Sequence, residues 1–310
     1  MIVAVVTAFR PDISLLENVA AIRSQVDHVV VVDDGSGPDA DSVLDLLASA
    51  GDTVLRSPSN EGIASALNRG VRSARQAGAT AVLTLDQDSA VRPGFVEELV
   101  AAHRLSAQVS SPVGFIVPEY FASVRQSLPG AAGPVLRADY RAIQSGMLIP
   151  VETLTAVGEF REDLFIDLVD LEFVLRCEDH GLPGVAAPGL RLEHSLGAQY
   201  ENRLFGVRLP IVPSTLTLST PFRYYYRARN RIIVNRSLSR GARSRLRRDT
   251  LIDGLHFVNA VLVARPRVAL ATVLIHAVRD ARAQRLGRAP EKVRRLASGI
   301  TWRVPRIPAK

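Results

Sequence analysis

The sequence predicts an α/β protein with a parallel sheet, followed by a basic helical region. Three observations predict this: apolar β-branched runs of strand length, helical periodicity between the first two of them, and a change of charge near residue 220. The 310 residues and the 47% apolar content suffice for one catalytic domain and a smaller appendage. We therefore predict a catalytic domain over residues 1–220 and a C-terminal region over residues 221–310.

The first elements form a strand, a helix and a second strand. Residues 2–7 and 29–32 are continuous apolar runs, and apolar residues recur at helical spacing between Leu15 and Val26, with Asp12 or Ser14 placed to cap the helix. This β-α-β order favours a parallel sheet, whose ligands bind outside the carboxyl ends of the strands. Residues 7–10 and 33–36 are thus expected at the binding edge.

Residues 33–36 read Asp-Asp-Gly-Ser, and they precede a short strand and a helix that begins near Asn60. A carboxylate here suits a pyrimidine N–H or a ribose hydroxyl, with Phe9 beside the base; an ordinary turn is the alternative. The chain contains neither a G-x-G-x-x-G nor a G-x-x-x-x-G-K-S/T phosphate loop, which disfavours Rossmann dehydrogenases and P-loop enzymes. Cys177 is the only cysteine, so an internal disulfide and a multi-cysteine metal site are excluded. No signal peptide is expected at the amino terminus.

An apolar run over residues 79–85 ends in two aspartates, Asp86 and Asp88. Residues two apart in a strand point to the same side, so a strand end here directs both carboxylates at one point. Paired carboxylates beside a substrate phosphate suit Mg²⁺ or Mn²⁺. The alternative is an acidic turn that caps the next helix.

Four motifs together resemble glycosyltransferase family 2 in order and spacing over about residues 1–200. They are Thr-Ala-Phe, Val-Val-Asp-Asp-Gly-Ser, Asn-x-Gly-x-x-x-Ala-x-Asn-x-Gly and Leu-Asp-Gln-Asp-Ser, and the last resembles the rhamnosyltransferase branch. The resemblance implies the GT-A fold, with a Rossmann-like, mostly parallel sheet and helices on both faces. It also implies a nucleotide-sugar donor, dTDP-rhamnose or a UDP-sugar. The residues implied for donor binding are Thr7, Phe9, Arg10, Asp34, Asn60, Gly62, Asn68, Asp86 and Gln87.

The resemblance further implies the catalytic base. Family members usually present Glu-Asp-x-Asp-Leu, which places the base on Asp170, although Val169 and Glu172 replace the flanking acids here. Helical spacing predicts Asp167 and Asp170 on one helical face. A helix-end carboxylate paired with arginine is the structural alternative for Asp170.

A strand predicted over residues 184–192 leads to His194. The family often uses a histidine at this place, so His194 is predicted as a third metal ligand or a diphosphate contact; a structural histidine is the alternative. Residues 111–150 contain many prolines and glycines, which predicts an irregular insertion before a strand that resumes at residues 144–149.

The C-terminal region is strongly basic, with 22 Lys and Arg against 4 Asp and Glu over residues 221–310. Such a surplus suits nucleic acid, an anionic membrane or an acidic partner. The Tyr-Arg-x-Arg-Asn motif at residues 226–230 resembles rhamnosyltransferases, which favours a lipid-linked diphosphate and anionic headgroups over nucleic acid. Apolar stretches at 251–264 and 268–278 are too short to span a bilayer and predict interfacial helices; a helical hairpin or an oligomer interface is the alternative.

The expected activity is inverting, metal-dependent transfer of a sugar, L-rhamnose by the resemblance. The expected acceptor is a hydroxyl of a lipid-linked or cell-envelope glycan, at the cytoplasmic face of the plasma membrane. Two other classes stay open: a nucleotidyltransferase acting on a sugar phosphate, and a non-catalytic scaffold that binds nucleic acid or the envelope through its basic tail.

Overall fold

The computed structural model describes residues 1–109, 112–194, 199–201, 215–237, 240–305 and 307. The chain divides into two compact units. The first, the sheet unit, comprises Met1–Phe165 and Val169–Ser195, and the second, the helical unit, comprises Ile166–Leu168 and Leu196–Lys310. The domain boundary after residue 220 stays a prediction.

The sheet unit alternates strands and helices. Its strands are β1 Ile2–Ala8, β2 His28–Asp33, β3 Thr53–Arg56, β4 Ala81–Asp86, β5 Ser89–Ala90, β6 Phe115–Phe121, β7 Val124–Arg125, β8 Leu136–Arg137, β9 Met147–Pro150 and β10 Gly184–His194. Its helices are α1 Ser14–Arg23, α2 Asp41–Ser49, α3 Ile63–Gln76, α4 Phe95–Val109, α5 Val151–Val157 and α6 Val169–Asp179, with short 3₁₀ turns η1 Pro38–Ala40 and η2 Glu162–Leu164.

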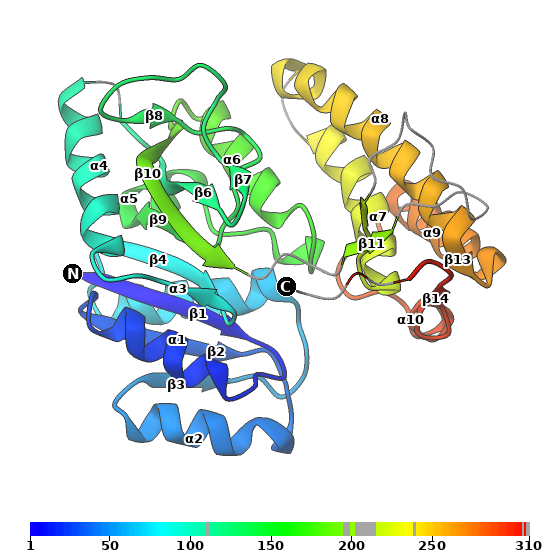
Figure 1. The fold of residues 1–310 in the computed structure, drawn as a ribbon, viewed down its shortest axis with the longest axis horizontal. Helices are drawn as coiled ribbons and strands as arrows, with labels where there is room; N and C mark the ends of the chain where they lie inside the picture. The colour runs from blue at the N-terminus through cyan, green and yellow to red at the C-terminus, as the bar shows by residue number, and fades with distance from the viewer. Residues whose placement is uncertain (110–111, 195–198, 202–214, 238–239, 306, 308–310) are drawn as a thin grey trace. The chain divides into compact units, whose positions relative to one another are not determined.

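The strands form one sheet in the order β3-β2-β1-β4-β9-β6-β10-β5 (Figure 1). Strands β3, β2, β1 and β4 pair in parallel, and β6 pairs in parallel with β10. Strand β9 runs antiparallel to both of its neighbours, β4 and β6. The mostly parallel sheet expected from the β-α-β pattern is therefore confirmed.

Helices cover both faces of the sheet because its strands are apolar on both sides. One core contains Ala4 and Val6 of β1 with buried side chains of α1, α2 and α4. Val5 points to the opposite face, since successive residues of a strand alternate. There α3 lies so close that a Cβ on its Gly70 would come within 2.2 Å of Val5 Cγ1. Close helix–sheet packing therefore requires glycine at this position.

The irregular insertion predicted over residues 111–150 contains a buried strand, so that prediction was wrong in part. Strand β6 spans Phe115–Phe121 despite Pro118. Proline lacks the N–H that a sheet ladder needs and is tolerated at irregular positions. Here Pro118 lies opposite Ala187 of β10, where the register shifts before Arg191. The bulge explains why a proline within an apolar run does not end this strand.

The helical unit is built from α7 Pro221–Ser237, α8 Arg240–Val263, α9 Arg267–Arg282 and α10 Glu291–Ser298, with short strands β11 Gln199–Glu201, β12 Thr215–Thr217, β13 Ala264–Arg265 and β14 Thr301–Trp302. The two apolar stretches of the sequence fall in α8 and α9, which are separate helices. No helix in the described part of the chain is long and apolar enough to cross a membrane.

Aromatic and arginine side chains of α7 build the core of the helical unit. Tyr224, Tyr225 and Tyr226 are each at most 2% exposed, and Arg229 is fully buried. The Arg229 guanidinium lies over the rings of Tyr225 and Tyr226, at 5.3 and 5.1 Å from their centroids. Part of the pattern that suggested anion binding therefore packs inside the protein.

Candidate active site

Three parallel strands bring predicted site residues to one edge of the sheet. Ala8 at the end of β1 pairs with Asp33 of β2, and Thr7 pairs with Asp86 at the end of β4. Asp34 is the residue that follows β2. The carboxyl ends of these strands therefore meet at the same edge, where open sheets of this kind bind ligands.

The loop after β1 is tied to the loops after β2 and β4. The Phe9 N–H donates to Gln87 Oε1 at 2.7 Å, and the Arg10 N–H donates to Ser36 Oγ at 2.6 Å. The Phe9 ring is 40% exposed, with the Arg10 guanidinium 5.2 Å from its centroid. An exposed ring at this edge can stack on a nucleotide base. The Gln87 side chain shapes the loop that carries the ring.

Asp34 connects the edge to the start of α3. Its buried carboxylate accepts the N–H groups of Glu61 and Gly62 at 2.7 and 3.0 Å. Burial raises the pKa of Asp34, and these two hydrogen bonds oppose the shift. At Gly62, where φ is +95°, a Cβ would lie 2.4 Å from the Phe165 carbonyl oxygen. Packing against Phe165 thus accounts for the glycine at position 62. Donor contacts of Asn60 and Gly62 stay a prediction.

The Asn68 side chain forms hydrogen bonds inside the protein and is only 1% exposed. Its amide donates to the Phe160 carbonyl at 2.8 Å and to Glu162 Oε1 at 2.9 Å, and its oxygen accepts the Phe160 N–H at 2.9 Å. These bonds fix the segment that leads toward Asp170. The predicted contact of Asn68 with the donor stays a prediction.

Asp86, Asp88 and His194 form a three-ligand group. One ligand atom from each lies within 4.8 Å of the others, as a divalent cation requires. Strand β5 pairs antiparallel with the end of β10, which sets His194 opposite Ser89, next to Asp88. Sequence positions more than 100 residues apart are thereby joined. The structure brings together all three residues predicted as metal ligands.

The state of His194 suits metal binding. Burial lowers its pKa, although Asp88 opposes the shift, and a lower pKa favours the neutral ring, whose lone pair can bind a metal. Nδ1 is buried, makes no hydrogen bond to the described residues and faces Asp88 Oδ1 at 3.5 Å. The ring packs on Phe121, with centroids 4.4 Å apart. An imidazole and two carboxylates are an ordinary donor set for Mn²⁺, and the carboxylates suit Mg²⁺.

Sequence reasoning missed the residues that orient this group. Gln144 Nε2 donates to Asp86 Oδ1 at 2.6 Å, and Ser145 Oγ accepts the Asp86 N–H at 2.9 Å. Ser145 Oγ also bonds Ser89 Oγ at 2.7 Å. Asn18 of α1 donates to the Gln87 carbonyl at 2.9 Å. The only sequence signal for Gln144 and Ser145 was that two adjacent polar residues lie just before the apolar strand β9.

Asp170 lies in the first turn of α6, where it is partly exposed. Its Oδ1 accepts the Leu171 N–H at 2.8 Å. The positive end of the helix dipole stabilises a carboxylate at this position. Asp167, which was expected on the same helical face, lies before the helix with a φ of +65°, so that prediction was wrong.

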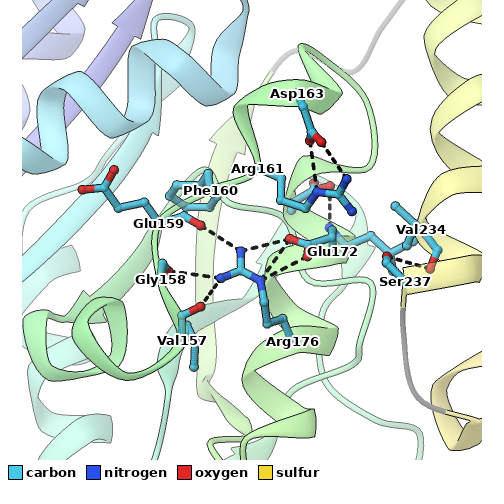
Figure 2. A network of polar contacts seen from close by, with 12 residues as sticks. Val157, Gly158, Glu159, Phe160, Arg161, Asp163, Glu172, Arg176, Val234 and Ser237 are labelled. Atoms are coloured by element: carbon cyan, nitrogen blue, oxygen red, sulfur yellow. Dashed lines mark hydrogen bonds and ion pairs between the residues drawn. The ribbon is translucent and has the colours of Figure 1, made fainter. Parts of the chain in front are cut away.

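Helix α6 is anchored by a buried ion pair at its centre (Figure 2). Arg176 donates to Glu172 at 3.0 Å, to the Glu159 carbonyl at 2.8 Å, and also to the Val157 carbonyl. The Glu172 and Arg176 side chains are 4% and 18% exposed. Arg176 therefore pairs with Glu172, and its hydrogen bonds to the carbonyls of Val157 and Glu159 hold α6, the helix that carries Asp170, against the end of α5.

The chain is similar to known glycosyltransferases. Residues 4–126 match the family model Glycosyl transferase family 2. The chain is 29% identical to the dTDP-rhamnosyl transferase RfbF of Shigella flexneri over 248 residues, which are 76% of this chain and 80% of the relative.

Two solved structures of S. aureus TarS share the fold. The TarS structure aligns with a TM-score of 0.54 and 14% identity over 95% of this chain and 50% of TarS. TarS 1-349 in complex with UDP-GlcNAc aligns with a TM-score of 0.50 and 13% identity over 77% and 67%. The chain spans about half the length of the longer TarS structure. The chain therefore has the GT-A fold shared with TarS, its residues 4–126 match glycosyltransferase family 2, and it is similar to a rhamnosyltransferase.

Proposed function

We propose that the protein transfers L-rhamnose from dTDP-rhamnose, with inversion, to a hydroxyl of a lipid-linked or cell-envelope glycan. The observation that carries the proposal is the group of Asp86, Asp88 and His194 at the ligand-binding edge of the sheet. The similarity to a dTDP-rhamnosyl transferase supports the choice of donor. Phe9 and Asp34 lie at the same edge and suit the nucleotide.

In this mechanism Asp170 accepts the proton of the acceptor hydroxyl as its oxygen forms a bond to the anomeric carbon. The bond between that carbon and the diphosphate oxygen breaks on the opposite face of the sugar. Mg²⁺ or Mn²⁺ bound by Asp86, Asp88 and His194 would supply positive charge for the departing diphosphate. Gln144 and Ser145 hold the Asp86 side chain and backbone in place.

The donor and the metal are tested together by thermal unfolding. We expect dTDP-rhamnose with Mn²⁺ to raise the melting temperature by several degrees, since ligand at about 100 times Kd contributes about 2.7 kcal/mol. UDP-sugars and dTDP-rhamnose without metal should raise it less. Asp88→Asn should remove the effect of Mn²⁺, whereas Asp39→Asn, an exposed aspartate after β2, should keep it. Preferential stabilisation by a UDP-sugar would refute dTDP-rhamnose as the donor.

We also propose that the protein acts as a peripheral protein on the cytoplasmic face of the plasma membrane. Helix α8 exposes a row of apolar side chains three or four residues apart, and α9 exposes two more. These side chains, the apolar row, are Leu251, Leu255, Val258 and Leu262 of α8 and Val268 and Ile275 of α9. Arginines that flank the row, such as Arg248 and Arg279, suit anionic headgroups.

Vesicle sedimentation tests this membrane proposal. The protein should bind phosphatidylglycerol vesicles at about 0.15 M salt and bind phosphatidylcholine vesicles much more weakly. Leu255→Glu with Val258→Glu should weaken binding at least about tenfold, because each apolar side chain contributes roughly 1.5–3 kcal/mol when fully buried. Leu46→Glu, at a leucine of α2 that is also exposed, is the control. Equal binding by all three proteins would exclude the apolar row as the contact.

A further inference from the structure

The segment before Asp170 has an unusual backbone. Phe165, Asp167 and Leu168 have φ angles of +67°, +65° and +64°. A non-glycine residue in this region costs of order 1–3 kcal/mol, and such residues persist only where the surroundings impose them. Leu168 precedes Asp170 by only two positions. Residues 166–168 are therefore the chain segment that leads directly to Asp170.

Helix α7 imposes this conformation through two side chains. The Asn230 amide donates to the carbonyls of Ile166 and Asp167 at 2.8 and 2.9 Å. The Arg223 guanidinium donates to the Asp167 carboxylate through Nε at 3.1 Å and Nη2 at 2.6 Å. Arg223 and Asn230 are seven positions apart, which places them on one face of the helix. We call this pair the loop clamp.

Arg229 fixes the orientation of the Asn230 side chain. Asn230 is fully buried, and its Oδ1 accepts from Arg229 Nε at 3.0 Å, so its NH₂ group points at the loop. Arg229 in turn donates to the Gly287 carbonyl at 2.6 Å. The aromatic core of the helical unit thus supports the amide that holds residues 166 and 167.

Both ends of the segment are also fixed. Phe165 is buried against Gly62, and Val169, the first residue of α6, is 3% exposed. The chain between these two buried positions contains the two peptide groups whose carbonyls Asn230 binds.

We propose that Arg223 and Asn230 are positioning residues for sugar transfer, which hold the strained segment so that Asp170 is aligned as the base. The inference rests on the proposed function of Asp170. It assigns the helical unit a part in catalysis that is separate from membrane binding, because neither residue belongs to the apolar row. Loss of the loop clamp should slow the chemical step and leave donor binding intact.

Arg223→Ala and its matched control Arg227→Ala test the proposal. Arg227 lies one turn further along α7, is similarly exposed and makes an equally short ion pair, at 2.6 Å, but with Asp253 of α8. Asp253 keeps Arg231 as a partner in that control. We expect Arg223→Ala to lower kcat about tenfold or more for Mn²⁺-dependent release of dTDP from dTDP-rhamnose with water as the sugar acceptor, and to leave KM for the donor within about twofold. Arg227→Ala should change neither constant.

Asn230→Asp gives a second, isosteric test. It replaces the NH₂ group that binds the loop by oxygen and keeps an acceptor for Arg229. We expect the same loss of kcat at unchanged donor KM. Three results would overturn the proposal. They are equal losses of kcat in Arg223→Ala and Arg227→Ala, a change confined to KM, and an unchanged kcat in both Arg223→Ala and Asn230→Asp.

Hydrogen–deuterium exchange separates this proposal from the proposed reaction, because it requires no substrate. The peptide covering residues 163–171 should exchange faster in Arg223→Ala and Asn230→Asp, and at the wild-type rate in Arg227→Ala. If the wild-type protein releases no dTDP, the proposed donor is wrong, and hydrogen exchange alone tests the loop clamp. Faster exchange only in the two loop-clamp variants would support the loop clamp. Unchanged exchange in these variants would refute it.

Discussion

Replacing Asp170 by asparagine is expected to slow sugar transfer by about 10²- to 10⁴-fold, the usual contribution of a positioned general base. The amide has nearly the same shape and cannot take the acceptor proton. It still accepts a hydrogen bond from Leu171, so α6 should keep its first turn. Steady-state rates with dTDP-rhamnose and Mn²⁺ measure the loss, and calorimetry should show unchanged donor binding.

Asp179→Asn is the control for this experiment, since Asp179 ends the same helix and is exposed. It should retain wild-type rates. Full turnover by Asp170→Asn would remove the acceptor base from the mechanism and favour a nucleotidyltransferase, which needs none.

Replacing Asp253 by alanine is expected to destabilise the helical unit by about 3–5 kcal/mol, the cost of removing one partner of a buried ion pair. The Asp253 side chain is 3% exposed and binds Arg227 at 2.6 Å and Arg231 at 2.8 Å. The Arg231 side chain is itself only 8% exposed, so its charge would stay buried without this partner. Urea unfolding followed by tryptophan fluorescence measures the change, because the sole tryptophan is Trp302 in this unit.

Glu291→Ala is the matched control in the same unit. Glu291 pairs with Arg294 at the surface, where the two side chains are 55% and 39% exposed. Exposed pairs contribute less than about 1 kcal/mol, so this variant should unfold nearly as the wild type does. If Asp253→Ala were no less stable than Glu291→Ala, the buried pair would not be a main support of α7 and α8.

Local sequence patterns predicted much of the sheet unit. The apolar β-branched runs before Thr7, Asp33 and Asp86 define strands by themselves, and parallel pairing then brings their ends together. The family resemblance extended this to His194, which the pairing of β10 with β5 places beside Asp88. The strands were predicted correctly because each depends on a short stretch of chain, and one general rule of sheet topology brings their ends together.

Other features depend on contacts that no local pattern encodes. Spacing alone placed Asp167 on a helix, whereas its carboxylate binds Arg223 and its carbonyl binds Asn230, both from a helix 56 or more residues later. Gln144 and Ser145 were predicted as the start of a strand, yet they lie just before β9 and bind Asp86 at the end of the neighbouring strand β4. Pro118 suggested irregular chain, and only the bulge in β10 makes its strand possible.

The assignment of Ile166–Leu168 to the helical unit matters for protein engineering. A chimaera that exchanges the C-terminal helices between related enzymes would join a foreign α7 to a native tripeptide shaped for Arg223 and Asn230. The graft should therefore include those three residues as well as the C-terminal region. A fusion point chosen from sequence alone, near residue 220, would leave them behind.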